Sequence, residues 1–140
     1  MAYLDANVFI FAAAIGDLED AKTAQSGRIL QKIAEGHITA STSILTWDEI
    51  IWACRASMPL KEAVGKGEIV LTLPNLSAKD ATALIVKKAA ELAIECPLRP
   101  RDAIHASTAI LNGEREIITD DADFDKVKDL RRVSLREASR

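Results

Sequence analysis

The sequence is poor in aromatic side chains and in cysteine, and it carries no excess of positive charge. Aromatic residues make up 4% of the 140 positions, which argues against base stacking as the main mode of nucleic-acid recognition. The two cysteines, Cys54 and Cys96, have no CxxC partner, so we expect buried or half-buried free thiols. No apolar run approaches the ~20 residues of a membrane-spanning helix. The N-terminal MAYLDANVFI contains an acid and no basic leader, which predicts a cytoplasmic protein.

Two motifs that often carry chemistry are also missing. No cluster of His and Cys indicates a zinc site. Gly65-Lys66-Gly67 lacks the spacing of a phosphate-binding loop and its following hydroxyl. The length and the ordinary globular composition, 49% apolar and 28% charged, predict one domain over residues 1–140.

Strand-like and helical segments alternate along the chain. We expect strands at residues 2–5, 37–41, 116–119 and 132–135, and helices at 7–15, 18–35, 77–92 and 102–111. The hydroxyls of residues 41–43 offer N-caps for a further helix, and Ser77 offers one for the helix that follows it. Residues 59–76 are the least readable, and 68–74 fits either a helix or a strand. The alternation predicts an α/β sandwich around a mostly parallel sheet of four to five strands.

Acidic side chains recur at the expected strand ends and on the first turns of the following helices. The set comprises Asp5, Asp48, Glu49, Asp102, Asp120, Asp121 and Asp123. Each acid has an ordinary alternative: Asp5 could be a helix N-cap, Asp102 could be a first-turn acid favoured by the helix dipole, and the others could be solvated. Functional residues of parallel sheets gather at the carboxyl ends of the strands, so four distant segments could present these acids together.

A cluster of carboxylates needs a counter-charge, because like charges in close contact disfavour ionisation. Mg²⁺ and Mn²⁺ prefer oxygen ligands, and they can lower the pKa of water and stabilise charge during phosphodiester hydrolysis. The acids therefore predict a Mg²⁺ or Mn²⁺ site.

Four motifs occur in this order along the chain: YLDANVFI, the Glu49-Ile50 pair, LRPRDAIHASTA and IITDDADFD. Together they resemble the PIN-domain family, and most closely the VapC toxins of prokaryotic toxin–antitoxin pairs. The resemblance runs from residue 3 to about residue 134. It implies a PIN-like α/β/α sandwich with a five-stranded parallel sheet.

Carried over residue by residue, the resemblance implies catalytic acids at Asp5, Glu49, Asp102 and Asp121, of which Asp5, Asp102 and Asp121 would ligate the metal. Glu49 fits because the second acid of the family precedes an aliphatic pair; Asp48 is its competitor. The resemblance assigns supporting roles, hydrogen bonds to carboxylates or to water at the metal, to Asn7 and Thr119. Asp123 is a weaker fifth acid, and Asp120 occupies a variable position.

The resemblance also implies a function: cleavage of single-stranded RNA with Mg²⁺ or Mn²⁺, by a homodimer that a VapB-like antitoxin inhibits. The alternative is a catalytically weak PIN-like module that binds RNA or a protein; the four filled acid positions argue against it. One departure from the family lies between residues 59 and 80. There a strand is expected to be missing or very short, which puts the sheet edge and the dimer surface in doubt.

The net charge of −3 needs an explanation in a protein expected to act on RNA. Without the five acids of the expected site, 18 basic side chains stand against 16 acidic ones, so the acidity is largely the site itself. Arg99, Arg101 and Lys126 could contact RNA phosphates, or they could equally form a solvated basic surface. His105, one helical turn beyond Asp102, is interpreted as a packed or capping histidine.

Overall fold

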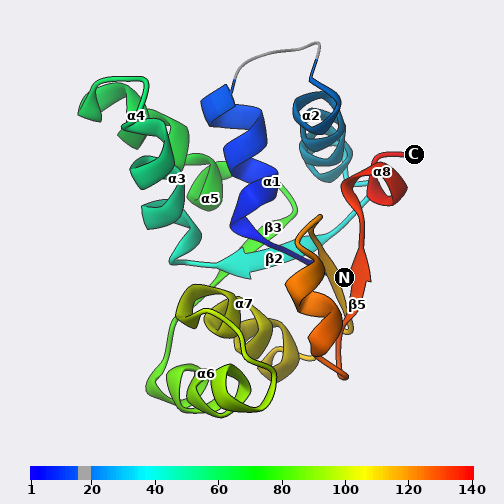
Figure 1. The fold of residues 1–140 in the computed structure, drawn as a ribbon. Coiled ribbons are helices and arrows are strands. Elements are labelled where there is room, and N and C mark those ends of the chain that lie inside the picture. The colour runs from blue at the N-terminus through cyan, green and yellow to red at the C-terminus, as the bar shows by residue number, and fades with distance from the viewer. Residues whose placement is uncertain (16–19) are drawn as a thin grey trace.

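The computed structural model describes residues 1–15 and 20–140 (Figure 1). In these ranges five strands form one parallel sheet in the order β3-β2-β1-β4-β5. The strands are β1 (Ala2–Leu4), β2 (Ala40–Ser43), β3 (Leu76–Lys79), β4 (Glu116–Ile118) and β5 (Arg131–Val133). The predicted α/β class and the predicted parallel sheet are confirmed.

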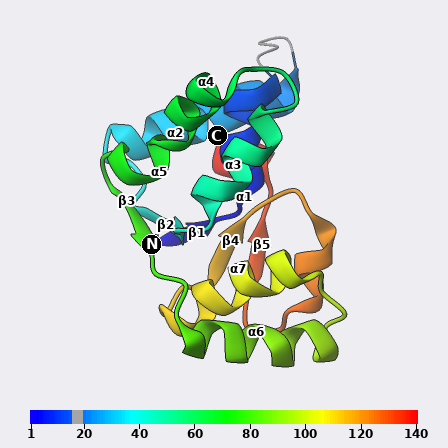
Figure 2. The same cartoon turned by 90° about the vertical axis from the view of Figure 1, so that its left-hand side faces the viewer.

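Helices cover both faces of the sheet, as Figures 1 and 2 show. One face carries α1 (Ala6–Ile10), which continues as a π-helical turn (Phe11–Ile15), with α2 (Ala21–Ala34), α3 (Thr46–Cys54), α4 (Leu60–Gly67), α5 (Ile69–Thr72) and α8 (Leu135–Ala138). The other face carries α6 (Ala83–Glu95), α7 (Pro100–Leu111) and a 3₁₀ helix (Ala122–Lys126). The molecule is therefore an α/β/α sandwich.

The two faces follow from the two-residue period of the central strands. Successive side chains of a strand point to opposite faces. Tyr3 and Ile117 accordingly enter the core beneath α6 and α7, and Leu4 and Ile118 enter the core beneath α1 and α2. Full burial of a large apolar side chain stabilises a fold by roughly 1.5–3 kcal/mol. This burial fixes the register of β1 and β4, and it thereby fixes the positions of the residues that follow these strands.

The second strand lies two to three residues later than predicted. It spans Ala40–Ser43, so Ser41 and Thr42 are buried strand residues rather than helix caps. A strand buried on both faces shows no polar alternation, and here small polar residues fill it. The Thr42 hydroxyl donates to the Leu4 carbonyl at 2.8 Å, which satisfies a polar group inside the sheet.

The segment that was hardest to predict contains a strand after all. Strand β3 has four residues, as many as β2, and all four pair in parallel with β2, so the expectation of a missing or very short strand is wrong. The ambiguous stretch 68–74 contains the helical turn α5. Ser77 lies in β3 and caps nothing, whereas the Thr82 hydroxyl accepts from the Ile85 N–H and caps α6.

Smaller differences concern element ends. Helix α2 begins at Ala21 because the Asp20 carboxylate accepts from two backbone N–H groups of the first turn; residues 18–19 of the predicted helix lie outside the described residues. The last strand ends at Val133, and Leu135 begins α8.

Both cysteines are free thiols, as predicted, Cys54 buried and Cys96 half-buried. Within the described ranges, no helix is long and apolar enough to cross a membrane.

Candidate active site

The strand order reverses its direction between β1 and β4. From β1 the chain proceeds to β2 and β3 on one side, whereas β4 and β5 lie on the other side. In open α/β sheets, ligands bind at the carboxyl ends of the strands where the order reverses in this way. Asp5 directly follows β1, and Thr119 and Asp121 follow β4. Two of the predicted acids thus stand at the position where the topology favours a site.

Asp5 is held by side chains of the site and not by the helix it precedes. It occupies the N-cap position of α1 but makes no side-chain cap hydrogen bond. Its Oδ2 accepts from the Thr119 hydroxyl at 2.8 Å, and its Oδ1 lies 3.8 Å from His105 Nε2. The side chain is almost fully buried, at 4% exposure. The helix-cap alternative therefore does not account for this acid.

Three further carboxylates converge beside Asp5. One oxygen from each of Asp102, Asp121 and Asp123 lies within 4.8 Å of the others. Asp102 lies on the first turn of α7, and Asp121 caps the 3₁₀ helix by accepting from the Asp123 N–H at 2.9 Å. The Thr119 hydroxyl also accepts from the Asp121 N–H at 3.1 Å, so this one side chain links Asp5 to the cluster.

Burial and the neighbouring negative charges disfavour the ionised forms of Asp5 and Asp102. Burial, together with the charges of Asp5 and Asp121, raises the pKa of Asp102 to about 6. Burial also raises the pKa of Asp5, although His105 and the Thr119 hydrogen bond oppose the rise. The nearest lysine contact in the described residues is Lys126, 3.3 Å from Asp123. Lys126, His105 and Arg99 offset only part of the negative charge, because the pKa of Asp102 still rises. The all-oxygen donor set fits Mg²⁺ or Mn²⁺ better than zinc.

We expect the metal-free protein to lose thermal stability as the pH rises from about 5 to about 7, through the raised pKa of Asp102. Asp5 and Asp102 have folded-state pKa values above those of the unfolded chain, so the folded state binds more protons in this window and loses stability as they leave. The raised pKa of His105 acts in the same direction, because its contribution is present at low pH. Melting curves in EDTA should show a fall of at least about 3 °C. A melting temperature that rises across this window would contradict the electrostatic description.

A buried chain of hydrogen bonds supports Glu49. The His105 Nε2–H donates to Glu49 Oε1 at 2.7 Å, and the Tyr3 hydroxyl lies 2.6 Å from His105 Nδ1. Burial lowers the pKa of His105, but the hydrogen bond to Glu49 and the charge of Asp5 outweigh it, and the net shift is upward. Glu49 is half-buried in this network, whereas its competitor Asp48 is exposed. The geometry therefore favours Glu49 as the second acid.

The contacts of His105 are the main feature that sequence reasoning missed. The predicted burial is found, with 1% of the residue exposed, yet the imidazole bridges Tyr3 and Glu49 and also faces Asp5. One signal was available: His105 follows Asp102 by three residues, a spacing that puts both on one helix face. Such spacing does not identify the partners, which come from β1 and α3.

The remaining predicted residues lie around the site in different ways. Arg99 and Arg101 are exposed at the start of α7, and Lys126 is paired with Asp123. Asp120, in the variable position, accepts from the Leu135 N–H at 2.9 Å and so anchors α8. Asn7 is half-buried in α1, and its supporting role stays a prediction.

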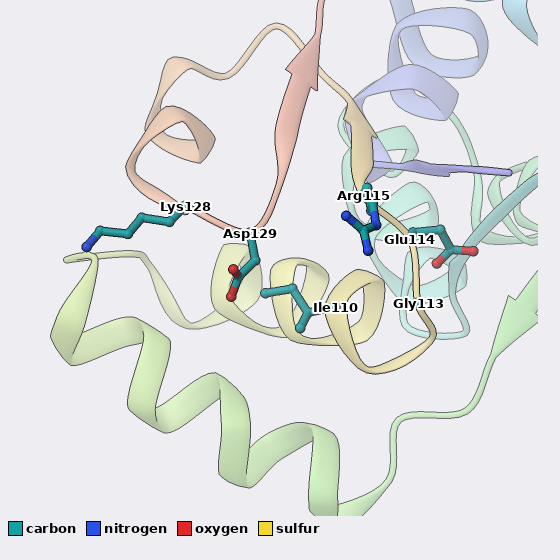
Figure 3. A pocket seen from close by; sticks show the side chains of 6 residues that line it. All are labelled: Ile110, Gly113, Glu114, Arg115, Lys128 and Asp129. Atoms are coloured by element: carbon teal, nitrogen blue, oxygen red, sulfur yellow. The ribbon is translucent and has the colours of Figure 1, made fainter.

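A hollow of about 410 Å³ lies at the opposite edge of the sheet. Figure 3 shows its lining residues, which come from the end of α7 and from the segments before β4 and β5: Ile110, Gly113, Glu114, Arg115, Lys128 and Asp129. None of the predicted site residues is among them. Because this hollow adjoins the amino ends of the strands, it is not where the topology favours a ligand.

Comparison with known proteins assigns the class. The sequence matches the PIN domain over residues 2–130, and the chain therefore belongs to the PIN-domain family. No curated protein sequence matches it significantly.

Several solved structures share the fold. A chain of VapBC2 from Rickettsia felis, bound to a promoter DNA fragment, is 20% identical with a TM-score of 0.71, covering 96% of this chain and 98% of that one. VapC20 of Mycobacterium tuberculosis, a Sarcin-Ricin loop cleaving toxin, is 16% identical with a TM-score of 0.72, covering 91% and 95%. FitAcB from Neisseria gonorrhoeae is 16% identical with a TM-score of 0.69, covering 97% and 99%.

Proposed function

We propose that this PIN-domain protein is a Mg²⁺- or Mn²⁺-dependent endoribonuclease that cuts single-stranded RNA. The observation that carries the proposal is the convergence of Asp102, Asp121 and Asp123 beside Asp5 at the carboxyl ends of β1 and β4. Four acids with little compensating positive charge are costly to fold unless a cation joins them.

The side chains of the site have separate roles in this proposal. Asp5, Asp102 and Asp121 would hold the metal, and Asp123 places an oxygen within 4.8 Å of those of Asp102 and Asp121. A bound Mg²⁺ or Mn²⁺ would supply a water of lowered pKa and stabilise charge on the phosphate. Glu49, which the hydrogen bond from His105 holds in place, could orient such a water and accept its proton. In-line attack on the phosphodiester would leave a 5′-phosphate and a 3′-hydroxyl.

We further propose that the chain is the toxin of a VapBC-type pair, acting in the cytoplasm as a homodimer that a VapB-like antitoxin inhibits. The support is that VapBC2 of Rickettsia felis and the toxin VapC20 of Mycobacterium tuberculosis share this fold along nearly the whole chain. The order of the four sequence motifs supports the same assignment.

The metal requirement gives the direct test. Wild-type protein should cleave an unstructured RNA with Mg²⁺ or Mn²⁺, stop in EDTA, and resume when the metal is restored. Calorimetry should show metal binding that Asp121→Asn weakens at least about tenfold, because a direct ligand is lost. A protein that takes up neither ion at millimolar concentration would instead be a module that binds RNA or a protein, and the endonuclease proposal would fail.

A further inference from the structure

Two pairs of side chains bridge helices α3 and α7 at the edge of the site. The inner pair is the buried contact between Glu49 and His105, 2.7 Å apart. The outer pair is Trp52 and Arg101, whose guanidinium carbon lies 5.7 Å from the centre of the indole ring. Trp52 follows Glu49 by three residues and Arg101 precedes His105 by four, so the outer pair lies about 5 Å further along the helices, or one turn.

Stability of the folded chain does not explain the outer pair. Trp52 is 70% exposed, so its large apolar ring remains in contact with water. A cation–π contact at such an exposed position contributes only about 0.5–1 kcal/mol. In the part of the chain that the structure describes, Arg101 is exposed and forms no ion pair with an acid. The pair thus presents an aromatic plane and a cation without an acidic partner, and the cation belongs to the residue that precedes Asp102 on α7.

We propose that Trp52 and Arg101 form a stacking platform for one unpaired base of the RNA. The proposal rests on the endoribonuclease function proposed above, because the acid cluster then marks the position of the scissile phosphate. The platform lies one helical turn from the Glu49–His105 contact, so a base stacked on it would belong to a nucleotide close to that phosphate. The guanidinium holds the indole in place, offers a second planar face, and faces the phosphate backbone with its charge.

A single stacking platform is compatible with the small number of aromatic residues in the sequence. Few aromatic side chains rule out a long surface of stacked bases, but one correctly placed ring is enough for one nucleotide. Stacking requires an unpaired base, so the platform favours single-stranded over duplex RNA. Every base has a π-face, so stacking sets this structural preference without reading a sequence.

Binding is measured in the Asp121→Asn background with Mg²⁺, so that the RNA stays intact. Fluorescence anisotropy gives the Kd for a labelled single-stranded oligonucleotide of adenosine and uridine, and for the duplex of the same sequence. Trp52→Ala should raise the single-strand Kd about tenfold or more and leave the duplex Kd unchanged. Trp52→Phe should keep most of the affinity. Arg101→Lys should restore only part of what Arg101→Ala loses, because lysine keeps the charge without the plane.

Steady-state kinetics and two control variants distinguish a specific loss of RNA binding from a general loss of folding or activity. In the active protein, Trp52→Ala should raise KM about as much as Kd while kcat changes less than about twofold. Leu71→Ala replaces another exposed apolar side chain, 66% exposed on α5, and Arg28→Ala replaces an exposed arginine on α2; neither should change KM. Single-stranded RNA should quench the fluorescence of Trp52, and Trp52→Phe should remove this signal.

The outcomes distinguish the platform from the function on which it rests. Wild-type protein that neither binds nor cuts RNA means that the proposed function fails. Wild-type protein that cuts RNA, with Trp52→Ala binding it equally well, overturns the platform alone. Equal loss of single-strand and duplex affinity also overturns it. Unchanged RNA affinity with weakened antitoxin binding assigns the pair to protein docking instead.

Discussion

Asp5→Asn is expected to lower the kcat/KM for RNA cleavage by at least about 100-fold without lowering the melting temperature. The activity falls because the substitution removes a negative charge directly beside the acid cluster, where a divalent ion would bind. An amide oxygen is a much weaker ligand for such an ion than a carboxylate, and it leaves the site one charge short.

The fold should tolerate the same substitution because its volume and one hydrogen bond are kept. The amide oxygen of asparagine can accept from the Thr119 hydroxyl as the carboxylate does. The substitution also removes a buried charge whose ionisation is disfavoured, as the raised pKa of Asp5 indicates. The metal-free variant should therefore be as stable as the wild type at pH 7, or more stable.

Asp48→Asn is the matched control. It makes the identical chemical change at an exposed acid on the first turn of α3, immediately before Glu49. We expect full activity from Asp48→Asn and a large loss from Glu49→Gln, measured with the same RNA. If Asp5→Asn cleaves RNA as well as the wild type, or if Asp48→Asn is the inactive variant, the assignment of the acids is wrong.

Much of the fold could be predicted because strands and helices alternate along the chain, and this alternation is typical of an α/β sandwich. The strand at 116–119 and the helix from Asp102 were placed within two residues, since an apolar run before an acidic turn and a proline at a helix start are local signals. The predicted bounds of strand β2 are two to three residues too early because no local sequence pattern marks this strand. Its small polar residues form a strand only because β1 and β3 pair with them on both sides.

The convergence of the acids could be predicted, but which of their oxygens lie closest together could not. Strand ends and helix starts can be identified from sequence, and Asp5, Asp102 and Asp121 lie at such positions. Which oxygens come within 4.8 Å depends on the path of the turn after β4, and that turn brings in Asp123. The bridge that His105 forms joins residues from three elements separated by 56 and 102 positions in sequence, and no local pattern encodes such partners.

His105→Ala is expected to lower the free energy of unfolding by about 3 kcal/mol or more. The substitution empties the space of a buried imidazole and leaves the Tyr3 hydroxyl without this partner. It also leaves Glu49 without its donor, so kcat should fall about tenfold at temperatures where the variant is folded. Denaturant titration gives the first quantity, and single-turnover cleavage gives the second.

A double-mutant cycle tests whether the network acts as a unit. Tyr3→Phe removes only the hydroxyl that lies 2.6 Å from the imidazole, so it should destabilise less than His105→Ala. Because the two side chains are in contact, their stability changes should differ from additivity by more than about 0.5 kcal/mol. His37→Ala, at the exposed second histidine, should leave stability and cleavage unchanged. Additive effects of Tyr3→Phe and His105→Ala, with an unaltered kcat, would reduce His105 to a packed core residue and remove the support proposed for Glu49.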